Sequence, residues 1–176
     1  IAMPGLIESD TGAVIFSPDF GWRDVPLEKW AQERLEPFHV IVRNANRAQA
    51  RWETRPGTNN KESTIFCVGL GYGIGSGIIS NGEVYYGSSG TSGEIGHIIV
   101  NPNGPVCLCG NSGCLEAVSS GRAIAEQAKE IVKKDADTVI RKLCNNDPEI
   151  ITAKTVFEAA MLQDEIAMHL IDQAAK

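Results

Sequence analysis

Residues 1–7 and 13–16 are mainly apolar, and a polar stretch that includes Ser9–Gly12 separates them. This pattern predicts two strands joined by a turn. Residues 17–26 contain two prolines and a glycine and are expected to form a loop. The apolar spacing of residues 27–36 predicts a short helix that ends before Pro37, because proline cannot continue a helix.

The next segment switches from a brief strand to a helix. His39–Val42 is expected to form a buried strand, since an unbroken apolar run suits a parallel sheet. A helical pattern follows from Asn44 to Arg55, with Asn44 or Asn46 as its N-cap. The polar residues 56–63 are then expected to form a loop.

The second half of the chain combines a hairpin, a long loop and two helices. Residues 64–87 predict two strands joined at Asn81–Gly82, a dipeptide typical of tight hairpin turns. Residues 87–113 are rich in loop signals. Helices are expected over 120–134 and 155–175, the second opening on a capping box from Thr155 to Glu158. The mixture of strands and helices predicts an α/β fold.

Composition narrows the classes of function. The chain is 43% hydrophobic and 22% charged, and no apolar run is long enough to span a bilayer. Its net charge of −6 argues against nucleic-acid binding by this segment, which would need a basic face. Arginines recur every four residues on the predicted helix and just before it, at Arg43, Arg47, Arg51 and Arg55. A solvent-exposed stripe of charge is favoured over a basic binding patch.

The ends of the chain and its cysteines suggest a cytoplasmic fragment. The sequence opens on apolar residues without an initiator Met or a recognisable leader, and it ends inside a helical pattern. We therefore expect a piece of a longer protein, lacking segments on both sides. Five cysteines without a secretory leader favour a reducing compartment. Cys67 is expected in the core, and Cys144 has no assigned role.

A glycine at nearly every second position marks the stretch GLGYGIGSG, Gly69–Gly77. Backbone amides at Gly71, Gly73 and Gly75 could converge on an anion, as in a phosphate loop. The stretch lacks the context of a dinucleotide fingerprint and the Gly-Lys-Ser/Thr ending of a P-loop. A glycine-rich turn without a ligand is the equally weighted alternative.

One histidine and three cysteines lie within eighteen residues: His97, Cys107, Cys109 and Cys114. Three thiolates and one imidazole match the ligands of tetrahedral zinc and would leave no open position, so such a metal would be structural. A buried histidine beside reduced cysteines is the alternative. Glu94 and Glu116 flank this cluster, where their carboxylates could accept hydrogen bonds from sugar hydroxyls or simply face solvent.

The segments GEIGH and CLCGNSGCLE, the upstream GLGYGIGSGII and the opening IAMPGLIES together resemble the ROK family of bacterial sugar kinases and sugar-responsive repressors. The resemblance covers essentially the whole chain. It implies an actin-like, ribonuclease-H-like α/β fold, of which this chain is a part, with a sugar bound between two lobes. Residues 1–62 would belong to the N-terminal lobe and residues 63–176, with the zinc-binding loop, to the C-terminal lobe.

The resemblance also assigns ligands. It implies zinc at His97, Cys107, Cys109 and Cys114. It implies sugar contacts from Asn44, Glu94, His97 and Glu116.

Two departures from the family pattern separate its branches. Family kinases carry Asn-Asp at the start of the helix, and the Asp is the general base; here the pair is Asn44–Ala45, with Glu53 as the family's later glutamate. Shifting the register to Asn46 does not restore an Asp, because Arg47 follows it. Tyr72 replaces a phosphate-contacting Thr in the glycine loop, which weakens the case for ATP binding.

We therefore expect the effector-binding part of a ROK-type transcriptional regulator, without a catalytic residue. The resemblance implies a homodimer or higher oligomer that contacts operator DNA through an N-terminal helix-turn-helix domain not present in this chain. A sugar kinase with an unconventional base is the main alternative. A zinc-stapled assembly module without a small-molecule ligand is the third.

Overall fold

The computed structural model describes residues 1–55 and 63–176. These residues form two compact units, here called unit 1 and unit 2. Unit 1 comprises residues 1–69 and 75–95, and unit 2 comprises residues 70–74 and 96–176.

The predicted polar loop over 56–63 lies outside the described residues, apart from Ser63. The two units are defined by contacts within this chain alone. The assignment of residues 1–62 and 63–176 to two lobes of a larger protein therefore stays a prediction.

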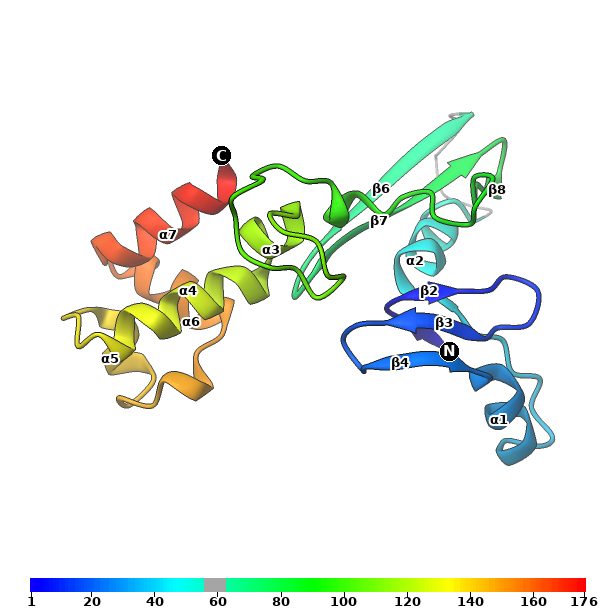
Figure 1. Ribbon diagram of the computed structural model, residues 1–176, viewed down its shortest axis with the longest axis horizontal. Helices are drawn as coiled ribbons and strands as arrows, with labels where there is room; N and C mark the ends of the chain where they lie inside the picture. The colour runs from blue at the N-terminus through cyan, green and yellow to red at the C-terminus, as the bar shows by residue number, and fades with distance from the viewer. Residues whose placement is uncertain (56–62) are drawn as a thin grey trace. The chain divides into compact units, whose positions relative to one another are not determined.

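Unit 1 opens with short strands and two helices. The strands are β1 (Ala2–Met3), β2 (Leu6–Ile7), β3 (Val14–Ser17), β4 (Trp22–Val25) and β5 (Arg43–Asn44), and the helices are α1 (Leu27–Arg34) and α2 (Ala45–Glu53). β2, β3 and β4 form an antiparallel sheet, and β1 pairs with β5 in parallel (Figure 1). The expected strand, turn and strand at the start of the chain, and the helix after residue 26, are confirmed.

The loop predicted over 17–26 is wrong, because β4 lies within it. Phe16 on β3 faces Arg23 on β4, and the Arg23 guanidinium lies 4.2 Å from the centre of the Phe16 ring. Val14 faces Val25 in the same register. Such cross-strand pairs stabilise a hairpin even where prolines and glycine dominate the local sequence.

The strand predicted over His39–Val42 is also wrong, although Val40 and Val42 are buried as expected. The Val40 N–H donates to Gln32 Oε1 at 2.9 Å, and the Val42 N–H donates to Glu28 Oε2 at 2.7 Å. Side chains of α1 therefore take the donors that a sheet would use, and pairing begins only at β5.

The helix predicted from Asn44 is confirmed as α2, with Asn44 as its N-cap. The Arg47 N–H donates to Asn44 Oδ1 at 3.1 Å. The cap satisfies one of the donors that the first turn of a helix leaves unpaired.

Three strands follow where two were predicted. They are β6 (Thr64–Leu70), β7 (Ile74–Ser80) and β8 (Glu83–Val84). The turn at Asn81–Gly82 joins β7 to β8 as expected, and both residues have positive φ, as a tight hairpin turn requires. The additional strand arises because Gly71–Gly73 forms a second turn, between β6 and β7. Cys67 on β6 is half-buried rather than part of the core.

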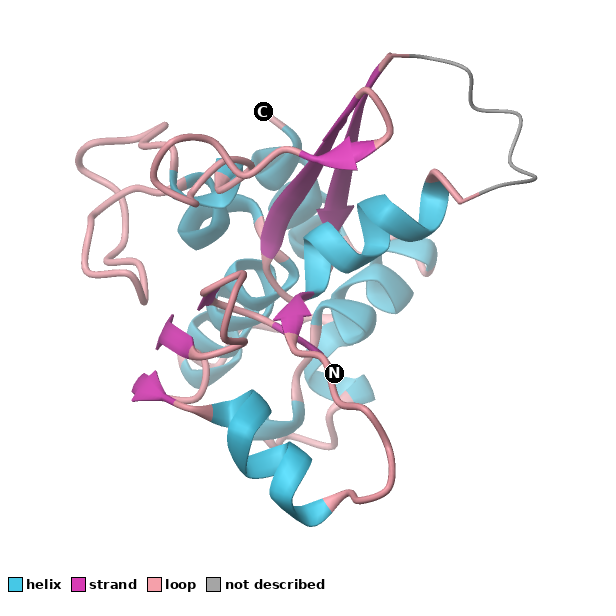
Figure 2. Cartoon of the chain, turned by 90° about the vertical axis from the view of Figure 1, so that its right-hand side faces the viewer, coloured by secondary structure: helices cyan, strands magenta, loops and turns pink. Residues whose placement is uncertain are grey.

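The loop-rich region expected over 87–113 is confirmed. It contains one short 3-10 helix, η1 (Ile95–His97), and otherwise loop (Figure 2). Two isolated bridges stabilise it, between Ile99 and Cys114 and between Val106 and Ser112.

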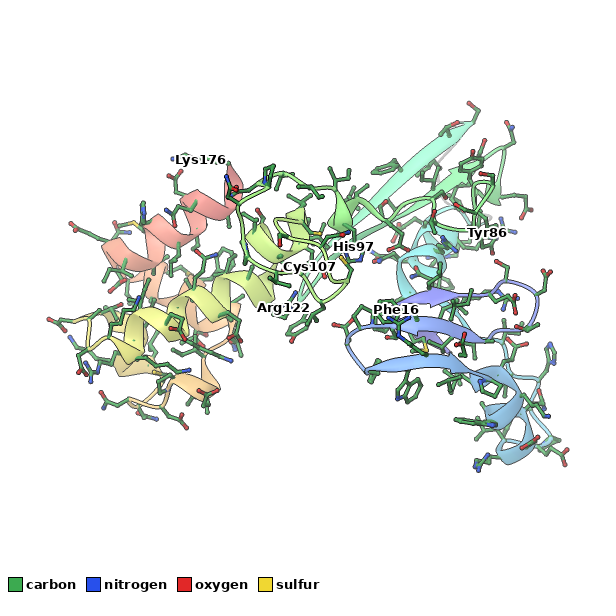
Figure 3. The ribbon with its side chains drawn as sticks, in the orientation of Figure 1. Phe16, Tyr86, His97, Cys107, Arg122 and Lys176 are labelled. Carbon is green, nitrogen blue, oxygen red and sulfur yellow. The ribbon has the colours of Figure 1, made fainter. Side chains whose placement is uncertain are left out.

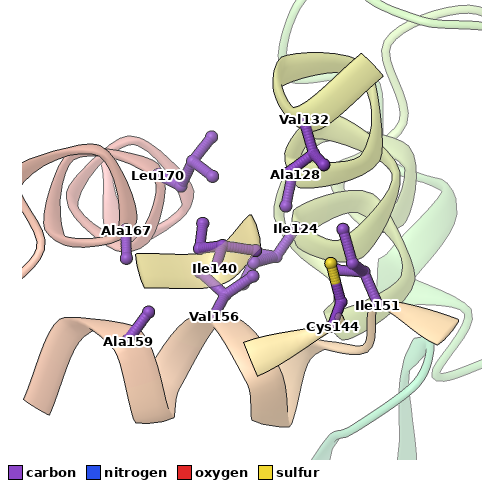
Figure 4. Packing of buried hydrophobic residues seen from close by; sticks show 10 residues of the cluster. All are labelled: Ile124, Ala128, Val132, Ile140, Cys144, Ile151, Val156, Ala159, Ala167 and Leu170. Carbon is purple, nitrogen blue, oxygen red and sulfur yellow. The ribbon is translucent and has the colours of Figure 1, made fainter. Parts of the chain in front are cut away.

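The rest of unit 2 is helical, with the bounds α3 Leu115–Ser119, α4 Gly121–Lys133, α5 Val139–Leu143, η2 Pro148–Ile150, α6 Ala153–Met161 and α7 Glu165–Ala175. Its core lies among α4, α5, α6 and α7 and includes Ile124, Ile140, Val156 and Leu170 (Figure 4). Cys144 lies in this core and is buried. Within the described part of the chain, no helix combines the length and apolar character that crossing a bilayer would need.

The single helix predicted over 155–175 is wrong, because the chain turns between α6 and α7. Gln163 has a φ of 62°, and Asp164 is the N-cap of α7. The capping box also lies elsewhere than predicted: Thr152 caps α6, and Thr155 occupies its third position.

Asp164 joins three parts of the helical core. Its carboxylate accepts hydrogen bonds from the N–H groups of Val139 (2.7 Å) and Ala167 (2.8 Å) and from the Thr138 hydroxyl (2.9 Å). Burial alone would raise the pKa of Asp164, but these hydrogen bonds outweigh it and lower the pKa below its usual value. The ionised form therefore stabilises the native state.

We predict that the Asp164→Asn substitution removes a pH-dependent part of the free energy of unfolding. A lowered native pKa stabilises above the unfolded value of about 3.9, and this stabilisation is lost as pH falls through the native pKa. Urea unfolding followed by helical circular dichroism should show a difference between the two proteins that is constant near neutral pH and shrinks in acid. Glu165→Gln, at the exposed neighbouring position, is the control. A difference independent of pH would contradict the prediction.

Candidate metal centre and sugar-site residues

The four predicted metal ligands lie together in unit 2. One ligand atom from each of His97, Cys107, Cys109 and Cys114 lies within 4.8 Å of all the others. Cys107 Sγ is 3.7 Å from His97 Nδ1, and Cys109 Sγ is 3.7 Å from Cys114 Sγ. Figure 3 shows His97 and Cys107 close to each other. Zn–S bonds of about 2.3 Å place sulfur ligands of a tetrahedron about 3.8 Å apart, so the spacing fits such an ion.

Backbone turns present these thiols to one another. The Cys107 N–H donates to Asn111 O at 2.7 Å, and the Gly110 N–H donates back to Cys107 O at 2.9 Å. Gly110 and Gly113 both have φ in the left-handed region. A Cβ at Gly113 would overlap the backbone of Asn101, so only glycine fits there.

The pKa values of the three thiols determine which protons a bound cation would displace. Burial, together with the neighbouring thiols of Cys109 and Cys107, raises the pKa of Cys114 to about 12. Burial likewise raises the pKa of Cys107. Burial would also raise the pKa of Cys109, but the Asn111 N–H and the two other thiols lower it on balance. A metal ion binds thiolates, so its binding would displace protons and weaken in acid.

The turn Gly71–Gly73 between β6 and β7, here called the hairpin tip, contacts the start of α4 within unit 2. The Gly121 N–H donates to Gly71 O and the Arg122 N–H donates to Tyr72 O, both at 2.9 Å. These two carbonyls therefore occupy donors at the N-terminus of α4 that might otherwise meet an anion. The role of the hairpin as a phosphate loop stays a prediction.

Glu116, a predicted sugar contact, anchors the same tip. Its Oε2 accepts a hydrogen bond from the Ile74 N–H at 2.8 Å, and its Oε1 lies 3.9 Å from Arg122 Nη2. A Cβ at Gly73 would overlap this carboxylate. Cys114, one of the four candidate metal ligands, is the N-cap of α3, the helix that carries Glu116. Sequence reasoning missed Arg122, which follows no motif.

Gly75 and Gly77 allow α2 to pack closely in unit 1. A Cβ at Gly75 would overlap the side-chain amide of Asn46, and a Cβ at Gly77 would lie 2.6 Å from both Ala50 Cβ and Asn46 O. α2 therefore lies directly on the backbone of β7. Gly75, predicted as part of a phosphate loop, has this structural role here.

Asn44 and Glu94, the other predicted sugar contacts, belong to unit 1, whereas His97 and Glu116 belong to unit 2. Asn44 is buried, and its Nδ2 donates to Gly5 O at 2.9 Å. Glu94 is half-buried and directly follows Gly93. The role of all four residues in sugar binding stays a prediction.

Both units contain cavities. A cavity of about 750 Å³ in unit 2 adjoins the hairpin tip and α4, with Tyr72, Arg122, Lys129 and Phe157 in its lining. A cavity of about 370 Å³ in unit 1 has Asn44, Arg47 and Tyr86 in its lining.

The predicted stripe of solvated arginines is wrong at Arg47. The side chain is buried, with 5% of the residue exposed, and its Nη2 donates to the carbonyls of Gly90 and Ser92. The four-residue spacing placed it on one helix face with Arg43 and Arg51, but could not indicate that a loop would cover it.

The chain matches known proteins along its whole length. The ROK family matches residues 1–176. A glucokinase from Halalkalibacterium halodurans is 38% identical over 99% of this chain and 53% of its own length. A putative xylose repressor from Caldicellulosiruptor sp. is 34% identical over 99% of this chain and 43% of its own length. The chain thus spans about half the length of the curated relatives it matches.

The structure of a ROK family glucokinase from Streptomyces griseus, in complex with glucose and AMPPNP, superposes with a TM-score of 0.83 at 32% identity. The match covers 97% of this chain and 55% of that protein. The expected actin-like α/β fold is therefore confirmed.

We predict that Gly77→Ala and Gly71→Ala differ sharply in stability. The added methyl at Gly77 would collide with α2, which cannot move freely, and should cost about 1–3 kcal/mol of unfolding free energy. Gly71 has open space around its Cβ position, so its substitution should change stability by less than about 0.5 kcal/mol. Urea unfolding of both variants measures this. Equal losses would show that α2 does not depend on the bare backbone of β7.

Proposed function

Because the chain belongs to the ROK family, we propose that it is the sugar-effector-binding part of a transcriptional regulator of carbohydrate utilisation. The observation that carries this proposal is Ala45 at the first position of α2. The resemblance to the family places the catalytic aspartate of its kinases at this position.

The start of α2 offers no replacement for that base. Its first turn contains no acidic residue. The methyl group of Ala45 cannot accept a proton, the Asn46 amide packs against Gly75, and Arg47 carries a buried guanidinium. Asn44 at the N-cap is retained, so the helix keeps a residue for sugar binding while lacking the group for phosphoryl transfer.

The cluster of His97, Cys107, Cys109 and Cys114 would hold a structural zinc ion in this protein. Four protein ligands leave no position for water or substrate, so the ion would supply folding energy rather than catalysis. It would fix the loop that carries His97 at one end and the start of α3, with Glu116, at the other.

We predict about one equivalent of zinc per chain when the protein is purified with its thiols reduced. Cys114→Ser should lower this content strongly, because Cys114 is fully buried among the other ligands. Cys144→Ser is the matched control, since Cys144 is buried in the helical core instead. Metal analysis of the three proteins measures this, and a metal-free native chain would contradict the proposal.

The sugar would contact Asn44, Glu94, His97 and Glu116, whose side chains can accept or donate hydrogen bonds to hydroxyl groups. Xylose is named in the repressor relatives and glucose in the bound structural relative, so these two sugars are the first candidates. Residues 1–62 and 63–176 would belong to the two lobes. The complete protein would act in the cytoplasm as a homodimer or higher oligomer and bind operator DNA through an N-terminal domain.

We predict that sugar changes the affinity of the complete protein for its operator. A sugar that binds one conformation better shifts the population toward it, and such couplings typically change affinity by about 5- to 150-fold. Operator titrations with and without D-xylose or D-glucose measure the change. Asn44→Ala should abolish the response while leaving DNA binding intact. An affinity that neither sugar changes would count against the regulator.

A sugar kinase is the second candidate, and two observations favour it. Glucokinase relatives are as similar to the chain as the xylose repressors are, at 38% identity in each group. The cavity of about 750 Å³ beside the hairpin tip is also large enough for a nucleotide-sized ligand. Ala45 and Tyr72 weigh against it, because one removes the base and the other adds a bulky side chain at the tip.

A further inference from the structure

Arg47 is a buried cation that serves neither the metal cluster nor the packing of an apolar core. Its guanidinium lies 5.0 Å above the centre of the Tyr86 ring and donates to Gly90 O and, at 3.2 Å, to Ser92 O (Figure 3 labels Tyr86). Burying a charge is costly unless it is hydrogen-bonded, so this side chain is bound tightly to the loop that it contacts.

Ser76 holds the same loop, Gly90–Gly93, through further hydrogen bonds. The Ser76 hydroxyl and the Ser76 N–H both donate to Gly93 O, at 2.7 and 3.0 Å. The Ser92 N–H closes the loop on itself by donating to Tyr86 O at 3.2 Å. The carbonyls of Gly90, Ser92 and Gly93 are thereby held by hydrogen bonds shortly before Glu94. These bonds limit where the Glu94 carboxylate can lie.

Arg47 also connects to the other proposed sugar contact of unit 1. The Asn44 side chain caps the backbone N–H of Arg47, while the Arg47 side chain donates to the loop before Glu94. Asn44 and Glu94 are fifty residues apart in sequence and are joined by this hydrogen-bonded path. The path lies entirely within unit 1.

We propose that Arg47 is a positioning residue whose side chain sets the geometry of Glu94 for sugar binding; this rests on the function proposed above. Arg47 itself does not touch the sugar in this account. Its loss would leave the carbonyls of Gly90 and Ser92 without this donor and loosen the segment between them. The Glu94 carboxylate would then sample more orientations and bind hydroxyls less tightly.

The neighbouring turn of α2 provides a matched control. Arg51 also donates to a backbone carbonyl, Gly82 O, and lies 3.5 Å from Glu83. Its side chain is half-exposed and serves the β7–β8 turn, not the loop before Glu94. Arg47→Met and Arg51→Met therefore remove the same chemical group from the same helix with different expected consequences.

The experiment compares the unmutated chain with Arg47→Met, Arg47→Lys and Arg51→Met. Calorimetric titration with D-xylose and with D-glucose measures affinity, and amide hydrogen exchange measures the protection of the Ser92 N–H. Arg47→Met should weaken binding at least about tenfold and speed Ser92 exchange by a similar factor. Arg47→Lys, which keeps a donor for one carbonyl, should recover part of both losses. Arg51→Met should change each by less than about twofold.

Unchanged Ser92 exchange in Arg47→Met, or equal losses in Arg51→Met, would overturn the proposal. Faster exchange with unchanged affinity would also overturn it, because Arg47 would then order the loop without serving the sugar. If neither sugar binds the unmutated chain, the proposed function fails instead, and the exchange of Ser92 alone still decides whether Arg47 holds the loop.

Discussion

The loop from Gly96 to Cys114 has almost no apolar core of its own, and this constraint governs unit 2. Its buried cluster consists of Cys107, Cys114 and Ala117, with Cys109 packed against them, while apolar side chains such as Ile98 and Val106 are exposed. A metal ion bound by the thiols would supply folding energy to this loop. The proposed zinc ion would therefore help to fix the start of α3 and, through Glu116, the hairpin tip.

In unit 1, close packing and hydrogen bonds hold α2, β7 and the loop before Glu94 together. α2 rests on the bare backbone of β7, which glycine makes possible, and Arg47 extends from the same helix to hold the loop before Glu94. Two of the proposed sugar contacts, Asn44 in unit 1 and Glu116 in unit 2, are thus held by hydrogen bonds between their own side chains and backbone groups. Ala45 begins α2, at the position where the resemblance to the kinases of the family predicts an aspartate.

The features that were predictable from sequence are local ones. The Asn81–Gly82 turn, the Asn44 cap and the spacing of the four metal ligands each follow from a few adjacent residues. β4 could not be predicted, because its pairing with β3 outweighs the local proline and glycine signals. The break before α7 depends on Asp164, whose hydrogen bonds to α5 are nonlocal. Arg47 was misassigned for the same reason: a loop forty-three residues further along covers it.

The proposed function requires a sugar-binding site that does not support phosphoryl transfer. An ATP-dependent phosphorylation assay of the complete protein tests this most directly. D-glucose and D-xylose are supplied at concentrations that saturate binding, and product formation is compared with that of Asn44→Ala. We expect the unmutated protein to show no turnover above the background of Asn44→Ala. Turnover by the unmutated protein that disappears in Asn44→Ala would contradict this expectation and assign the chain to a kinase.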